Sequence, residues 1–119
     1  EPYMVVRKVQ NALDERLGKD RKPIQLVGHN VAFDISFAKR LWRHAGLEES
    51  FKKDFRSRAL DTCSILEYLM LSGKVKGFRA SGDVLFEAGD VIIEKEDRHT
   101  ALGDAMATAK AMESLITKF

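Results

Sequence analysis

The sequence lacks the features that mark secreted, disulfide-bonded or membrane-spanning proteins. It has a single cysteine, Cys63, so no disulfide forms within the chain, and a reducing cytoplasm is the expected compartment. No stretch approaches the roughly 18 consecutive apolar residues that suggest a membrane span. Residues 1–7 lack the basic start and apolar run of a signal peptide. We therefore expect a soluble, cytoplasmic protein without a membrane partner.

The chain has the size and composition of one globular domain. It contains 119 residues, of which 45% are hydrophobic, and has neither an internal repeat nor a low-complexity tract. We therefore expect a single domain over residues 1–119. The net charge of +2 is too small to indicate nucleic acid by itself, but the middle third of the chain is basic. Lys39, Arg40 and Arg43 share one predicted helix, where they form a stripe able to follow the phosphates of a single strand. The alternative is that the stripe is only a solvent-facing helix surface.

The hydrophobic pattern predicts alternating helices and short strands. A helix over 2–17 is stopped by Gly18, and a buried strand over 24–28 follows. The next helix runs from about Asp34 to Gly46, and its predicted inward face contains Ile35, Ala38, Leu41, Trp42 and Ala45. A second strand over 58–61 precedes a helix whose cap is Asp61 or Thr62. A short helix is expected after residue 81 and a final helix from about residue 100. This order predicts an α/β fold with parallel strands, although two strands make too little sheet for about five helices.

The end of the first predicted strand carries the first candidate site residues. In open α/β sheets, ligands bind beyond the carboxyl ends of strands, so Asp34 is expected to face a crevice. Phe33 offers a flat surface on which a base stacks, and Asn30 offers an amide that holds a carboxylate or a backbone turn. The alternative is that Asp34 only caps its helix and Phe33 belongs to the core.

The final predicted helix carries the second candidate carboxylate, Asp104. Small residues surround it, so we expect it in a confined place, and a divalent cation is an attractive partner because no basic residue lies within a helical turn. His99 precedes the helix in a charged approach, from which its ring can reach the site. The alternatives are an exposed Asp104 near a helix N-terminus and an uninvolved His99. The predicted apolar face of this helix contains Leu102, Met106, Ala109, Met112 and Ile116.

These motifs occur together in an order that resembles a known nuclease family. Asn-x-x-x-Phe-Asp follows an apolar strand, a second strand ends in Leu-Asp-Thr, and His-x-Ala-Leu-x-Asp-Ala opens the terminal helix. The pattern resembles the DEDDh (DnaQ-like) 3′–5′ exonucleases, over essentially the whole chain. The resemblance implies a ribonuclease H-like fold and a hydrolase that removes nucleotides from the 3′ ends of single-stranded DNA or RNA. It also implies two bound Mg²⁺ or Mn²⁺ ions.

The resemblance assigns a role to three of the candidate residues. Asp34 and Asp104 become the metal-binding acidic residues of the second and third family motifs, and His99 becomes the general base. Asn30 and Phe33 are expected to bind substrate because of the amide and the flat ring described above. DNA is the favoured substrate, and a polymerase or other protein is a possible partner. Neither the oligomeric state nor the physiological metal follows from the sequence.

One part of the family pattern has no match in this sequence. The first motif, Asp-x-Glu on an early strand, is absent, and in the family three antiparallel strands precede the helix that resembles residues 2–17. We therefore expect an exonuclease fold without its N-terminal three-stranded meander, and no nuclease activity from these residues alone. The main alternative is a non-catalytic module of degenerate exonuclease fold that binds nucleic acid or protein. The other is an unrelated α/β phosphoesterase or binding domain whose motif match is accidental.

Overall fold

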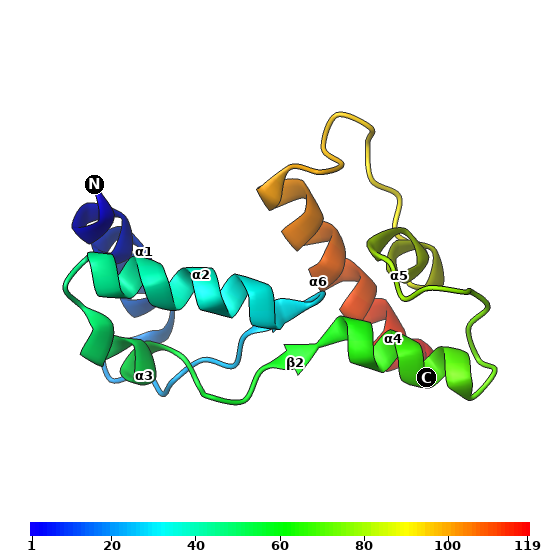
Figure 1. The fold of residues 1–119 in the computed structure, drawn as a ribbon, viewed down its shortest axis with the longest axis horizontal. Coiled ribbons are helices and arrows are strands. Elements are labelled where there is room, and N and C mark those ends of the chain that lie inside the picture. Colours follow the sequence, from blue (N-terminus) through cyan, green and yellow to red (C-terminus); the bar gives the residue numbers. More distant parts are fainter. The chain divides into compact units, whose positions relative to one another are not determined.

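The computed structural model describes residues 1–119 and divides them into two compact units. Unit 1 comprises Glu1–Leu26 and Val31–Leu60, and unit 2 comprises Val27–Asn30 and Asp61–Phe119. The expectation of one domain over 1–119 stays a prediction. In chain order the elements are α1 (Pro2–Leu17), β1 (Val27–Gly28), α2 (Val31–His44), η1 (Glu48–Ser50), α3 (Phe51–Asp54), β2 (Leu60–Asp61), α4 (Thr62–Leu71), α5 (Gly82–Ala88) and α6 (Ala101–Lys118) (Figure 1). None of the helices is both long and apolar enough to cross a membrane.

Capping residues set most of the helix ends where the sequence predicts them. Gly18 ends α1 with φ of 92°, a left-handed conformation that glycine adopts without steric cost. Asp61 caps α4 because its side chain accepts a hydrogen bond from the Cys63 N–H. Ser81 caps α5 because its side chain accepts one from the Val84 N–H. Thr100 caps α6 through the Gly103 N–H. The predicted helix boundaries at these four residues are therefore confirmed.

The sheet is smaller than the predicted strands. β1 and β2 form a two-stranded sheet, and a separate parallel bridge joins Ile24 to Phe55. The expected continuous strand over 24–28 is therefore wrong. The Arg56 N–H donates to the Ile24 carbonyl and the Leu60 N–H donates to the Leu26 carbonyl, both at 2.9 Å. The paired positions are thus four residues apart between Arg56 and Leu60 but only two apart between Ile24 and Leu26. The extra residues on the longer side interrupt the ladder of hydrogen bonds. The mixture of helices and a small parallel pairing fits an α/β fold.

Unit 1 is built around Trp42. α1 packs against α2 (Figure 1). The buried cluster of this unit consists of Val6, Trp42, Ala45 and Phe51. The Trp42 ring lies with its centroid 5.6 Å from that of Phe51 in an edge-on arrangement. The short α3, which the sequence analysis does not predict, supplies Phe51. The predicted inward face of α2 is confirmed.

A buried polar network lies beside this cluster and was not predicted. The Asp54 carboxylate accepts hydrogen bonds from Gln10 Nε2 at 2.8 Å, Trp42 Nε1 at 2.9 Å and Arg21 Nη2 at 2.7 Å. Arg21 also pairs with Asp14 at 3.0 Å. Burial raises the pKa of Asp54, but the three donors lower it by more, so the net shift is downward. The carboxylate is therefore held ionised within unit 1.

Unit 2 packs α4, α5 and α6 around Leu66, Leu85 and Leu115. The predicted apolar face of α6 is wrong, because Leu102 is 74% exposed, and Met106 and Ile116 are exposed too. The helix instead buries a small-residue face that contains Ala107 and Ala111. A short side chain on this face lets α5 and α6 approach more closely than large side chains would allow.

Gly89, at the C-terminal end of α5, makes this close approach possible. A Cβ atom at this position would lie 2.7 Å from the Ala111 Cα atom, and the clash is with backbone. We expect Gly89→Ala to lower the free energy of unfolding of unit 2 by about 1–3 kcal/mol, the usual cost of overpacking. Chemical denaturation followed by far-UV circular dichroism measures the change. Glu87→Ala, an exposed substitution on α5, is the control and should change stability by less than about 0.5 kcal/mol. Equal stability of the two variants would contradict the packing argument.

Candidate active site

Asp34 lies in unit 1, in the first turn of α2, as an exposed carboxylate. The helix begins at Val31, so the prediction that it starts at about Asp34 is wrong by a turn and Asp34 is not its cap. The side chain has no hydrogen bond or ion pair, which leaves both carboxylate oxygens available to a cation. An anionic group in a first helical turn is also favoured by the helix dipole.

Phe33 lies beside Asp34 on the solvent side of α2 and does not belong to the core. Its side chain is 63% exposed, and its ring lies 5.0 Å from that of Phe37. The Arg40 guanidinium lies 5.5 Å from the Phe37 ring centroid. Exposed aromatic faces with a neighbouring cation are suited to stacking on a nucleic-acid base.

Asn30 lies in unit 2 and forms the turn between β1 and α2. Its φ of 59° is left-handed, a conformation that asparagine tolerates better than most residues. Its backbone N–H donates to Asp61 Oδ1 at 2.8 Å, and the same oxygen accepts from the Cys63 N–H at 2.9 Å. The turn is thereby tied to the start of α4, and the exposed Asn30 is presented from a fixed backbone.

His29, next to Asn30, reinforces this anchoring. Its Nδ1 atom lies 2.9 Å from Thr62 Oγ1, and its Nε2 atom lies 2.6 Å from the Ala80 carbonyl oxygen. Because a carbonyl oxygen only accepts, Nε2 carries the proton in this arrangement. His29 therefore positions the turn.

Asp104 lies in unit 2, in the first turn of α6, and is partly buried with a side-chain exposure of 36%. Its Oδ1 atom accepts from Arg98 Nη1 at 2.8 Å and from the His99 backbone N–H at 3.2 Å. The expectation that Asp104 lacks a basic neighbour is therefore wrong. Arg98 precedes the helix in a loop that folds back, so helical spacing alone does not reveal the pair. The second oxygen, Oδ2, has no protein partner.

Arg98 is held firmly in its position. Its guanidinium also pairs with Asp83 at 3.0 Å and lies 5.1 Å from the Phe86 ring centroid. Burial acts to lower the pKa of Arg98, but the hydrogen bonds and charges of Asp83 and Asp104 raise it on balance. This permanent cation fixes the loop that carries His99 to α5 and α6. Arg98 was not predicted as part of the site, although a basic residue between Asp83 and Asp104, each at the start of a helix, was a usable signal.

His99 is exposed in this loop, with a left-handed φ of 70°. Gly103 makes the tight loop possible, since a Cβ atom there would overlap the Asp97 carbonyl oxygen and lie 2.6 Å from Thr100 Oγ1. The His99 backbone donates to Asp104, while its ring has no hydrogen-bond partner. The structure therefore brings His99 and Asp104 together in unit 2, and it presents Asp34 and Phe33 in unit 1.

Two other kinds of reactive group bear on the candidate site: the Cys63 thiol and clusters of metal-binding side chains. Burial, followed by the charges of Glu67 and Asp61, raises the pKa of Cys63, so this thiol is poorly suited to act as a nucleophile. Within either unit, no group of three or more histidine, cysteine, aspartate or glutamate side chains gathers in a way that could hold a metal ion.

Comparisons with known proteins give one informative similarity. No family model matches the chain, and no solved structure matches it. A protein of Rhodobacter capsulatus named "DNA polymerase III subunit epsilon-like protein" is 37% identical over 91 residues. The matched stretch covers 76% of this chain but only 12% of that relative. The similarity supports a relationship to the DnaQ-like nuclease family that the sequence motifs resemble.

Proposed function

We propose that the protein containing this chain is a metal-dependent 3′–5′ exonuclease that hydrolyses terminal phosphodiesters of single-stranded DNA or RNA, with DNA the favoured substrate. The observation that carries the proposal is the 91-residue similarity to the epsilon-like protein, which extends over most of the chain. The motif order supports it independently. The relative's name also motivates a polymerase as a protein partner.

Asp34 and Asp104 are the proposed metal ligands. Magnesium and manganese prefer carboxylate oxygens, and the unpartnered Asp34 carboxylate and the open Oδ2 atom of Asp104 fit such a cation. When bound, two cations would neutralise the scissile phosphate and acidify the attacking water. Two carboxylates are too few for two ions, so the proposal includes further acidic ligands from outside these 119 residues.

The other proposed roles belong to His99, Phe33 and Asn30. His99 takes the proton of the attacking water, a step suited to an imidazole near neutral pH. Its exposed ring, in a loop fixed by Arg98, supports this role. Phe33 stacks on the terminal base, and Asn30 holds the substrate or the backbone of the turn. None of these residues is committed to the core of either unit.

A cation at Asp104 must compete with Arg98, and this gives a direct test. We expect Arg98→Gln to increase the apparent Mn²⁺ affinity about 2–5-fold, because a partly exposed ion pair of up to about 1 kcal/mol no longer opposes the metal. Isothermal titration calorimetry on the full-length protein measures the affinity. Arg79→Gln, which removes an exposed and unpaired arginine, should leave it unchanged. Weaker Mn²⁺ binding in the Arg98 variant would contradict the proposal that Mn²⁺ and Arg98 compete for the Asp104 carboxylate.

The activity itself is tested with the full-length protein and 5′-labelled single strands. We expect a ladder of products shortened from the 3′ end in the presence of Mn²⁺, with parallel DNA and RNA strands deciding the substrate. Asp34→Asn should abolish this ladder, whereas Asp20→Asn, an exposed aspartate outside the motifs, should not. Full-length protein that leaves both strands intact, or an Asp34 variant as active as the control, would contradict the proposal. The non-catalytic binding module would then be the better description.

A further inference from the structure

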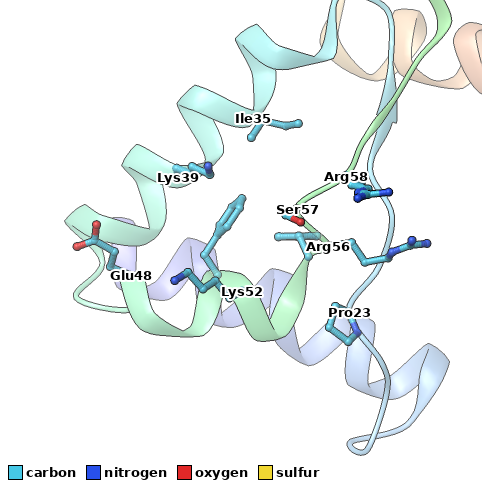
Figure 2. Close-up of a pocket in the computed structure, with 10 residues that line it drawn as sticks. Pro23, Ile35, Lys39, Glu48, Lys52, Arg56, Ser57 and Arg58 are labelled. Atoms are coloured by element: carbon cyan, nitrogen blue, oxygen red, sulfur yellow. The ribbon is translucent and has the colours of Figure 1, made fainter.

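A pocket in unit 1 contains none of the proposed catalytic residues. It has a volume of about 760 Å³ and lies between α2, the η1–α3 segment and the residues that precede β2. Figure 2 shows Ile35 and Lys39 extending from α2 toward the segment that carries Ser57. Four basic residues line the pocket, together with apolar side chains and one acid, Glu48. We call it the basic pocket and define it by Lys39, Lys52, Arg56, Arg58, Phe51 and Phe55.

The positive charge of the basic pocket is not neutralised by the protein. None of its four basic side chains makes an ion pair. Glu48 pairs at 3.4 Å with Arg43, which does not line the pocket. Arg21, by contrast, is matched by two aspartates. Unpaired cations around a concave surface raise the local concentration of anions and favour phosphate groups.

One wall of the basic pocket is apolar and consists of packed aromatic rings. The Phe51 and Phe55 ring centroids lie 5.2 Å apart, and both rings contact Trp42. Lys39 Nζ lies 5.9 Å from the Phe51 ring centroid, so a cation borders the aromatic wall. Small-molecule sites commonly combine an apolar lining with a few polar groups, in volumes of about 300–1,000 Å³.

We propose that the basic pocket binds a nucleotide, with the phosphate on its lysines and arginines and the base against the apolar wall. The nucleotide is either free or a unit of a single strand that passes through unit 1. The inference does not rest on hydrolysis, because Asp34, Asp104 and His99 do not line the pocket. Binding measured without divalent metal therefore tests it separately from the proposed nuclease function.

The test measures binding of adenosine 5′-monophosphate to the full-length protein by calorimetry, in the presence of a chelator. We expect Lys39→Ala/Lys52→Ala to weaken this binding at least about tenfold, since two charge-assisted contacts are lost. The matched control, Lys8→Ala/Lys53→Ala, removes two exposed lysines of the same unit that lie outside the pocket and should change binding less than about twofold. Lys39→Arg/Lys52→Arg should retain binding, which separates charge from folding.

Competition experiments identify the source of the nucleotide. Displacement of the monophosphate by a 12-nucleotide single strand supports a strand in the pocket, whereas no displacement supports a free nucleotide. Inorganic phosphate and adenosine should each bind more weakly than the monophosphate, because each engages only one part of the pocket. Phosphate that binds as tightly as the monophosphate, absence of monophosphate binding, or equal loss in both double-alanine variants would overturn the inference.

Discussion

Replacing Asp54 with alanine is expected to lower the free energy of unfolding of unit 1 by about 3–5 kcal/mol, the usual cost of breaking a buried charge pair. The substitution leaves the Arg21 side chain, only 7% exposed, without its closest carboxylate. It also removes the acceptor of Gln10 Nε2 and Trp42 Nε1. Urea denaturation followed by Trp42 fluorescence measures the loss. Asp20→Ala, at an exposed aspartate without an ion pair, is the control and should change stability by less than about 0.5 kcal/mol.

The same network predicts how unit 1 responds to acid. The pKa of Asp54 in the folded protein lies below the ordinary aspartate value. Its contribution to the stability of unit 1 is therefore fully present when the pH is above the ordinary aspartate pKa. This stabilising contribution is lost as the pH falls through the lower pKa that Asp54 has in the folded protein. We therefore expect the wild-type protein to lose Trp42 fluorescence at low pH, and Asp54→Asn to remove this part of the acid transition. An Asp54→Asn variant with an unchanged acid profile would mean that other carboxylates control it.

Local signals account for what the sequence predicted correctly. Gly18, Asp61, Ser81 and Thr100 act on their own helix ends through conformation or a single hydrogen bond, so their positions can be read without the fold. The prediction of which face of α2 is buried was also correct, because the large Trp42 side chain lies on that face. Large apolar residues at helical spacing are a strong signal when one face is clearly more apolar than the other.

The errors arise where distant segments decide the outcome. On α6, the large apolar residues Leu102, Met106 and Ile116 are exposed. The small-residue face is buried instead, because Gly89, which caps α5, packs directly against Ala111. The partners of Asp54 come from Gln10, Arg21 and Trp42, which only the tertiary fold brings together. Arg98 reaches Asp104 through a loop with a left-handed residue, which helical periodicity does not describe. The sequence therefore identified the motif residues but not the contacts that control their charge.

His99→Ala is expected to reduce the turnover of the full-length protein about 10²–10⁴-fold, the typical contribution of a general base. The affinity for Mn²⁺ and for a single strand should remain nearly unchanged, because the His99 ring makes no hydrogen bond and its backbone N–H to Asp104 is retained. Single-turnover kinetics give the rate, and a separate titration gives the strand affinity. The loss should therefore appear in kcat with little change in Kd.

Two further variants separate catalysis from loop conformation. His99→Asn removes the base but keeps a residue that tolerates the left-handed φ of 70°, so it should lose as much activity as the alanine variant. His44→Ala, at an exposed histidine near the end of α2, should retain wild-type turnover. A His99→Asn variant with wild-type turnover would show that the residue only shapes the loop. A parallel loss of strand affinity and rate would instead make His99 a substrate-holding residue, and the proton of the attacking water would then need another acceptor.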